Sequence, residues 1–220
     1  MYLSRNLAAM KANTIAGFVV TCVGDNRAYS FLPSRNGATL ADRVAEHVLK
    51  NEVGEFARYS FLDRGSDERQ YCSPGVELPV VSVMRTKYAQ YPEYHTSLDD
   101  LSLVSPEGLS GAYRVLQRCL EVIEANAVLR TTVLCEPQLG KRGLYPTLST
   151  NESGRQVQTM MNLLAYADGS RDLVELSDLI GAPAWECAEL AEKLMTIGLV
   201  EAIDKPAPTA RLTAAEIGTE

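Results

Sequence analysis

Asp67 and His95 are the residues of this sequence whose types and surroundings best suit metal chemistry. They lie 28 residues apart (95 − 67), and an apolar run at residues 78–84, LPVVSVM, lies between them. This run is short and rich in β-branched residues, which predicts a buried strand. A carboxylate before such a strand and an imidazole after it can meet at one sheet edge, where open α/β sheets usually bind ligands. Zinc hydrolases take both ligand types and keep one coordination position open for water.

Simpler interpretations of the same acids stay open. Asp67 could be an ordinary loop acid and His95 a hydrogen-bonded loop histidine. Glu68 and Glu93 flank the two candidates and are interpreted as solvated loop acids, although Glu93 could also support His95 from behind. We expect Asp99 to cap the turn after His95, or to orient the imidazole, rather than to bind metal.

Nearby cationic and aromatic residues could complete a binding site. Arg69 and Arg85 could pair with a substrate carboxylate or with neighbouring acids. Tyr91 and Tyr94 could line the mouth of a substrate pocket or pack an irregular loop. Cys72 is interpreted as a small buried apolar residue rather than a nucleophile.

Other patterns predict the elements that position these residues. The apolar run 15–23 predicts a strand buried on both faces, and the alternation at 55–62 predicts another strand. Apolar residues at helical spacing predict a helix over 39–50 with Thr39 as its N-cap. A long helix is expected over 106–128.

The composition changes after this helix. Residues 135–154 are rich in Gly, Pro, Ser and Thr and predict a linker that wraps the first domain. Three helical patterns and a strand follow, in the order of a winged-helix domain, at 156–167, 173–180, 184–197 and 198–203. We therefore expect an α/β domain over 1–134, the linker over 135–154, a winged helix over 155–204 and a disordered tail over 205–220.

Composition and charge exclude several function classes. The chain has 220 residues, 46% of them hydrophobic, and a net charge of −7. Residues 155–203 carry three basic and eight acidic side chains, which makes nucleic acid an unlikely partner of the winged helix. No run is long enough to span a membrane, and the N-terminus lacks a signal peptide. The five cysteines form no CxxC pair, which favours free thiols and a cytoplasmic location.

One set of motifs resembles the second half of the di-zinc aminopeptidase family. The set is Ser66-Asp67 before a helical turn, Gly75-Val76-x-x-Pro79 at the entry to a strand, and His95-Thr96-x-x-Asp99 in the loop after it. The resemblance implies that Asp67 is a terminal ligand of one zinc and His95 a terminal ligand of the other.

Four segments extend the resemblance to one bacterial branch of this family. They are SDERQYCSPG, YPEYHTSLDD, CEPQLGKRGLYPTLS and LLAYADGSRDL, and the resemblance covers nearly the whole chain. Members of the branch are labelled polysaccharide biosynthesis proteins with an aminopeptidase-like domain and carry a C-terminal winged helix. The resemblance implies a doubly wound, mostly parallel sheet with helices on both faces, followed by that winged helix.

The chain departs from the family pattern at its beginning. The family's first ligands, a His-x-Asp and a bridging Asp, precede the strand that matches residues 15–23. The acidic general base of the family precedes that strand as well, so we expect the general base upstream of Met1 and assign no catalytic residue within the chain.

The expected function follows from this departure. We expect a zinc-dependent aminopeptidase-like hydrolase domain that is truncated and lacks part of its metal site. Its substrate would be a peptide or small amide, and a second copy or a partner chain would cover the exposed sheet. The alternative is a non-catalytic remnant that binds a partner through the winged helix.

Overall fold

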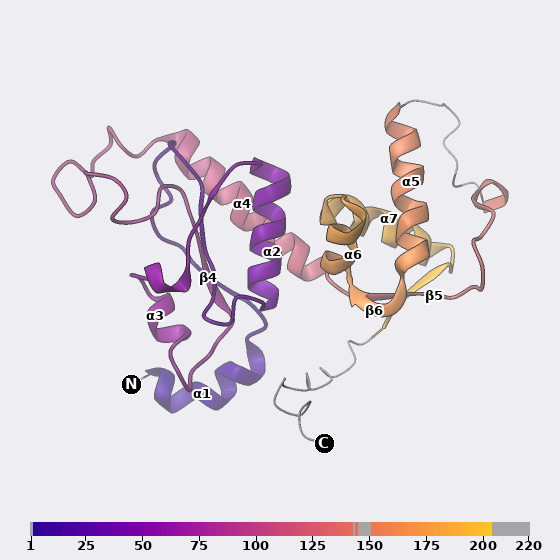
Figure 1. Cartoon of the computed structure of the whole chain (residues 1–220), viewed down its shortest axis with the longest axis horizontal. Coiled ribbons are helices and arrows are strands. Elements are labelled where there is room, and N and C mark those ends of the chain that lie inside the picture. Colours follow the sequence, from indigo (N-terminus) through magenta and orange to yellow (C-terminus); the bar gives the residue numbers. More distant parts are fainter. Residues whose placement is uncertain (1, 143, 145–150, 204–220) are drawn as a thin grey trace, which may run out of the picture.

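The computed structural model describes residues 2–142, 144 and 151–203, which form two domains in contact with each other (Figure 1). The first domain contains a four-stranded mixed sheet, and the second a three-stranded sheet flanked by helices. The predicted class, an α/β sheet followed by a winged-helix domain, is confirmed. The predicted tail and the middle of the predicted linker lie outside the described residues. Met1 also lies outside them. The general base expected upstream of Met1 stays a prediction.

The buried strand predicted between Asp67 and His95 lies inside the first sheet. All five residues of β4 are buried, and β4 pairs with β1 in parallel and with β2 antiparallel. β2 and β3 pair in parallel, so parallel pairing predominates, as predicted. The spatial order is β1-β4-β2-β3, and the strands are β1 (Gly17–Val19), β2 (Ser30–Leu32), β3 (Ala57–Arg58) and β4 (Val80–Met84).

Helices cover both faces of this sheet. The helices of the first domain are α1 (Tyr2–Asn13), α2 (Leu40–Val48) with its π-helical extension η1 (Leu49–Val53), α3 (Glu68–Tyr71) and α4 (Pro106–Ala125). Val81 and Val83 of β4 share an apolar cluster with residues of α2 and α4. Val80, on the opposite face, packs with Cys72 at the end of α3 and with Leu3 of α1. Figure 1 shows α2 and α4 on one side of β4 and α3 on the other.

Local capping signals set where the two long helices begin. Thr39 is the N-cap of α2, as predicted, and forms a reciprocal capping box with Asp42. Ser105 caps α4 by accepting a hydrogen bond from the Gly108 amide (3.0 Å), and Pro106 occupies the first turn.

Two predicted strands are much shorter than expected. The run 15–23 contributes only Gly17–Val19, and Ile15 and Val20 are 66% and 64% exposed. The run is less buried than predicted: β1 lies at the end of the sheet order with one neighbouring strand, and of its three residues only Val19 is buried. Of residues 55–62, Ala57–Arg58 pair as β3, and the chain then turns into a 3₁₀ helix, η2 (Phe61–Asp63), capped by Ser60.

The second domain has winged-helix organisation. Its three predicted helical patterns correspond to α5, α6 and α7, and Gly181 ends α6 in the left-handed conformation. The predicted domain boundary at residue 134 places β5 in the first domain. In the structure β5 belongs to the second domain, where it pairs with both β6 and β7. The elements are β5 (Val128–Thr131), η3 (Leu139–Arg142), α5 (Asn151–Tyr166), β6 (Asp168–Asp172), α6 (Leu173–Ile180), α7 (Ala184–Thr196) and β7 (Val200–Ile203).

Polar contacts join α2 to the second domain. Arg43 donates two hydrogen bonds to the Asp172 carboxylate, at 2.9 and 2.7 Å. The ring of His47 lies 2.6 Å from Asp178 through Nδ1 and accepts the amide N–H of Ala184 through Nε2 at 2.8 Å. A backbone amide can only donate, so Nε2 carries no proton and Nδ1–H donates to Asp178. His47 therefore caps the beginning of α7.

Candidate functional site

Hydrogen bonds join the loops that follow β1 and β4. Since these strands are parallel, the loops lie at the same end of the sheet, which we call the edge. The Arg85 amide donates to the Cys22 carbonyl at 2.8 Å. The buried carboxylate of Asp25 accepts hydrogen bonds from the amide (2.9 Å) and hydroxyl (2.7 Å) of Thr86. Asp25 was not among the predicted site residues, although a carboxylate directly after an apolar run is a signal for a role where the strands end.

Asp67 stands at the beginning of α3 with its side chain uncommitted. It precedes the helix in N-cap position, but its backbone is helical (φ −67°, ψ −22°) and its carboxylate makes no capping hydrogen bond. The two amides before it, those of Gly65 and Ser66, donate instead to Oε1 of Glu68, each at 2.8 Å. Because Asp67 is also exposed, its carboxylate oxygens are available to a ligand.

Glu68 is fully buried, so its interpretation as a solvated loop acid is wrong. Besides the two amides, its carboxylate accepts the hydroxyls of Ser82 (3.2 Å) and Tyr88 (3.0 Å). Burial alone would raise the pKa of Glu68, but the hydrogen bonds from Ser66, Gly65 and Tyr88 outweigh burial and lower it. Burial and the neighbouring Glu68 both raise the pKa of the Tyr88 phenol.

His95 lies in the loop between β4 and α4 in an unusual backbone conformation. Its φ is 58°, in the left-handed region that costs a non-glycine residue about 1–2 kcal/mol. The exposed imidazole stacks on the ring of Tyr94, with centroids 4.0 Å apart and planes at 18°. Among the described residues, neither ring nitrogen has a hydrogen-bond partner. A strained residue with a free imidazole is consistent with a functional position.

Tyrosines connect the surroundings of the two candidate ligands. The hydroxyl of Tyr88 bonds to Glu68, the residue after Asp67, and its ring lies 6.3 Å from the ring of Tyr94. Tyr94 in turn stacks on His95. Tyr91 meets the edge of Tyr94 at 5.7 Å, so Tyr91 and Tyr94 pack the loop. A chain of contacts through Glu68, Tyr88 and Tyr94 thus links the turn that carries Asp67 to the loop that carries His95.

The two acids near His95 do not contact its ring. Glu93 binds Arg27 through both oxygens, at 3.0 and 2.7 Å, and this pairing lowers the pKa of Glu93 to about 2. Within the described part of the chain, the Asp99 carboxylate makes no hydrogen bond. The turn is stabilised instead by the Thr96 hydroxyl, which accepts from the Leu98 amide at 3.2 Å.

Neither candidate arginine pairs with a carboxylate among the described residues. Arg69 is exposed and donates to the Ser66 carbonyl at 3.1 Å. Arg85 is buried, donates to the Asp25 carbonyl at 2.9 Å, and places its guanidinium 3.7 Å from the centroid of the Tyr29 ring. Arg85 therefore fixes the loop after β1.

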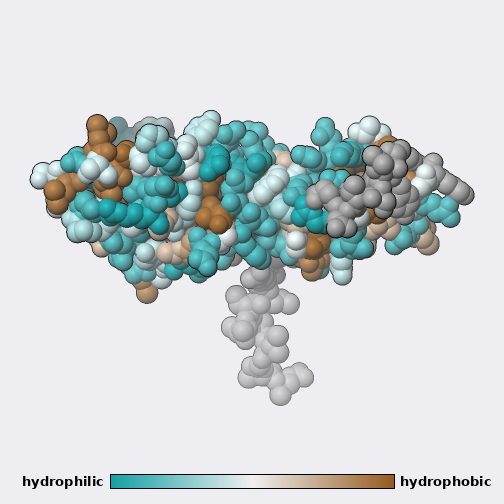
Figure 2. All heavy atoms as spheres, turned by 90° about the horizontal axis from the view of Figure 1, so that it is seen from above, coloured by the Kyte–Doolittle hydropathy of each residue, from teal (hydrophilic) through white to brown (hydrophobic). Residues whose placement is uncertain are grey.

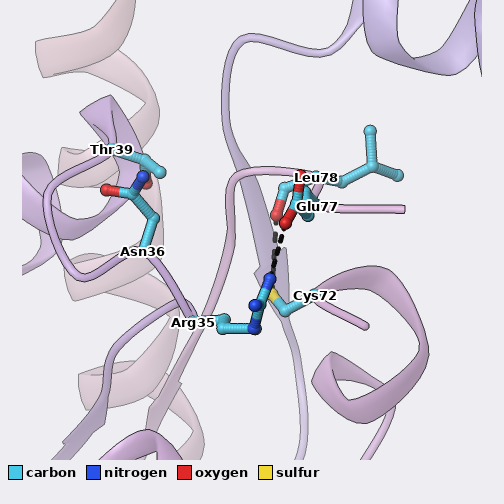
Figure 3. A pocket seen from close by; sticks show the side chains of 6 residues that line it. All are labelled: Arg35, Asn36, Thr39, Cys72, Glu77 and Leu78. Carbon is cyan, nitrogen blue, oxygen red and sulfur yellow. Dashed lines mark hydrogen bonds and ion pairs between the residues drawn. The ribbon is translucent and has the colours of Figure 1, made fainter. Parts of the chain in front are cut away.

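A cavity of about 430 Å³ lies near the beginning of β4 and is separate from these residues. Figure 3 shows Arg35 reaching across it toward Glu77, at 2.6 Å. Cys72 borders the cavity, but its thiol donates to the Val80 carbonyl (3.1 Å), and burial raises its pKa. This agrees with its interpretation as a buried small residue. The lining residues are Arg35, Asn36, Thr39, Cys72, Glu77 and Leu78.

Apolar side chains are exposed at the end of the molecule that carries the loop between β4 and α4. Figure 2 shows apolar surface at its left, the end at which Figure 1 places the loop between β4 and α4. Leu98 and Leu101 of this loop are 60% and 89% exposed. None of the described helices is both long and apolar enough to cross a membrane.

The side chains of Asp67 and His95 offer atom types that bind zinc, but the two residues alone are too few to form a zinc site. Their oxygen and nitrogen atoms are free and are ligands that zinc accepts. Across residues 2–142, 144 and 151–203, no three His, Cys, Asp or Glu side chains gather closely enough to hold a metal ion. The described residues alone therefore do not form a metal site, and a metal-binding role for Asp67 and His95 stays a prediction.

Comparison with known proteins gives this region a family. Residues 1–126 match the model described as "Domain of unknown function (DUF4910)", and residues 127–202 match a winged helix-turn-helix model. A Clostridium acetobutylicum protein is 33% identical over 204 residues, which are 92% of this chain and 46% of that protein. Its name describes a candidate polysaccharide biosynthesis protein with an aminopeptidase-like domain.

A solved structure gives the same result. The crystal structure of a candidate peptidase from Clostridium acetobutylicum superposes with a TM-score of 0.81 at 32% identity, covering 92% of this chain and 45% of that one. The resemblance inferred from the sequence motifs is confirmed by these matches. This chain spans about half the length of the relatives it matches.

Proposed function

This chain belongs to the DUF4910 family, and from that premise we propose that it provides part of the zinc site of an aminopeptidase-like hydrolase. The observation that carries the proposal is the pair formed by Asp67 and His95. Both side chains are exposed and make no hydrogen bond among the described residues, and contacts through Glu68, Tyr88 and Tyr94 link the turn of Asp67 to the loop of His95. Without a hydrogen-bond partner in the described part of the chain, the Asp67 oxygens and the His95 ring nitrogens stay available to a ligand.

In the complete site, Asp67 would provide a carboxylate oxygen and His95 a ring nitrogen to two zinc ions. When bound, such a metal pair polarises a scissile carbonyl and provides hydroxide, which suits a peptide or small amide substrate. The remaining ligands and the general base would come from residues other than those described. Exposed Ile15 and Val20 at the open edge of β1 suit contact with a second copy or a partner chain.

Zinc affinity tests this proposal. We expect competition with a chromophoric chelator to detect zinc binding to the full chain, weakened about 10-fold or more in Asp67→Ala and in His95→Ala. Asp99→Ala is the matched control, because it removes an exposed carboxylate from the same loop that makes no hydrogen bond there. Zinc binding that is absent, or equal in all four proteins, would contradict the proposal.

The winged helix is packed and charged in a way that does not suit DNA binding. Helix-turn-helix proteins read bases with the first residues of the second helix of the motif. Here those residues, Ala184 and Trp185 of α7, pack into the cluster formed by α2 and α4. The excess of acidic side chains in this domain is also unfavourable for phosphate contacts. The alternative of a remnant that binds partners through this domain has no specific observation in its favour.

The cysteines support a cytoplasmic protein. Each of Cys22, Cys72, Cys119, Cys135 and Cys187 is a free thiol. Thiols that are not paired persist in a reducing compartment, so we retain the cytoplasm as the proposed location.

A further inference from the structure

We propose that Glu68 is a positioning residue, whose buried carboxylate holds the turn carrying Asp67 and the loop carrying His95 in a fixed relation. Its role in metal binding rests on the proposed function above. Its effect on the geometry of the edge does not require metal and can be tested separately.

The Glu68 carboxylate first holds the turn that carries Asp67. Oε1 of Glu68 accepts the amides of Gly65 and Ser66, the two residues that lead into Asp67. Hydrogen bonds to an ionised carboxylate are stronger than those between neutral groups. The turn is also pressed against the aromatic loop, since a Cβ at Gly65 would lie 2.5 Å from a ring carbon of Tyr88. The position of Asp67 is therefore set by Glu68 and Tyr88 together.

The same carboxylate also holds the start of the loop that carries His95. The Tyr88 hydroxyl donates to the same oxygen of Glu68, and the other oxygen accepts the Ser82 hydroxyl of β4. Glu68 thus joins its own turn to a strand and to a loop. Ser82 of the strand is 14 residues away along the chain, and Tyr88 of the loop is 20 residues away. From Tyr88 the contact continues through Tyr94 to His95. Without the carboxylate, Tyr88 would lose its buried acceptor and the His95 loop its anchor.

Glu68 acts through other residues because it cannot reach a ligand itself. Its exposed fraction is 0%, and its two oxygens accept four hydrogen bonds among the described residues. A buried carboxylate that only stabilised the fold would show its loss across the whole domain. A positioning residue would show its loss first at the edge, at Asp67 and His95.

The two histidines of the chain allow these outcomes to be separated. In protein labelled with ¹³C and ¹⁵N in histidine only, His95 reports the edge, and buried His47 reports the interface between the domains. Stacking on Tyr94 shifts the His95 ring protons through the aromatic ring current. The variants are Glu68→Gln, Glu68→Ala and Tyr88→Phe. Glu77→Gln is the control, because it changes an exposed acid between α3 and β4.

Without metal, we expect the His95 signals of Glu68→Ala to move to the position of an unstacked histidine and those of Tyr88→Phe to move partway. Glu68→Gln keeps the shape of the side chain and should restore most of the wild-type position. His47 should stay unchanged throughout, and Glu77→Gln should match wild type. Unmoved His95 signals in both Glu68→Ala and Tyr88→Phe would overturn the proposal. Should Glu68→Ala unfold, which moves His47 as well, Tyr88→Phe alone decides.

A zinc titration of the same samples adds the functional part. We expect the zinc-induced shift of His95 to require about 10-fold more zinc in Glu68→Ala than in wild type, because groups behind a ligand tune metal affinity by 10–100-fold. If the wild-type His95 signal ignores zinc, the proposed function fails while the metal-free result for Glu68 still stands. If zinc shifts His95 equally in wild type and Glu68→Ala, the positioning role fails and the metal site stands.

Discussion

Replacing His47 with alanine should open the contact between the two domains. The His47 side chain is 1% exposed and bonds to Asp178 and to the first amide of α7, that of Ala184. The single tryptophan of the chain, Trp185, lies beside it with ring centroids 6.3 Å apart. One substitution therefore removes a helix cap, a side-chain hydrogen bond and an aromatic contact at the same place.

The size of the effect follows from these contacts. Ala184 is 1% exposed, so its amide would be left buried without an acceptor, which costs about 1–3 kcal/mol. The bond to Asp178 contributes less, about 0.5–1 kcal/mol, because that carboxylate is 49% exposed. With the lost packing, we expect His47→Ala to lower the free energy of unfolding by about 2–4 kcal/mol. Domains are stable by only about 5–15 kcal/mol, so the change is large.

Urea unfolding followed by two signals tests this reasoning. Trp185 fluorescence reports the interface, and far-ultraviolet circular dichroism reports the helices of both domains. In His47→Ala we expect the fluorescence transition to move to lower urea than the dichroism transition. Glu46→Ala, which removes an exposed carboxylate from the same helix, should change the free energy by less than about 0.5 kcal/mol. An unchanged urea midpoint and emission maximum in His47→Ala would refute the role of this histidine as a cap.

Four further predictions use other parts of the structure. Gly108→Ala should destabilise the protein in thermal melts, because its Cβ would lie 2.1 Å from the Gly24 carbonyl oxygen. Gly154→Ala in α5 meets no neighbour within 4 Å and should stabilise by about 0.5–1 kcal/mol. The pKa of Glu93 is lowered to about 2, so its pairing should protect loop amides from hydrogen exchange above about pH 4.5. That protection should decline toward pH 2, and Glu93→Gln should abolish the decline. Exposed Cys135 should react with a thiol reagent in native protein, whereas three buried thiols should react only after unfolding, namely Cys72, Cys119 and Cys187.

Features set by local chemistry were predictable from the sequence. The run 78–84 contains only small, β-branched and apolar residues, and it contains the buried strand β4. Thr39 and Pro106 are typical of helix beginnings, and α2 and α4 begin beside them. In each case the deciding interactions lie within a few residues along the chain.

Features set by distant contacts were not predictable. Glu68 follows Asp67 in a polar segment, and only the folded chain brings Ser82 and Tyr88 against it. The run 15–23 is as apolar as a central strand, but its place at the sheet edge leaves Val20 exposed. Sequence spacing likewise gave no reason to pair Glu93 with Arg27, 66 residues away.

The second domain contributes buried residues to the core of the first domain. Val174 of α6 and Ala184 of α7 belong to the same buried cluster as Val81 and Val83 of β4. The winged helix therefore completes the core behind the strand from which Ser82 contacts Glu68. Removing it would uncover part of that cluster and cost about 25 cal/mol for each Å² of apolar surface returned to water. A substitution that loosens the packing of α7 should thus also affect β4 and, through Ser82, the position of Glu68. The winged helix therefore stabilises the core of the first domain.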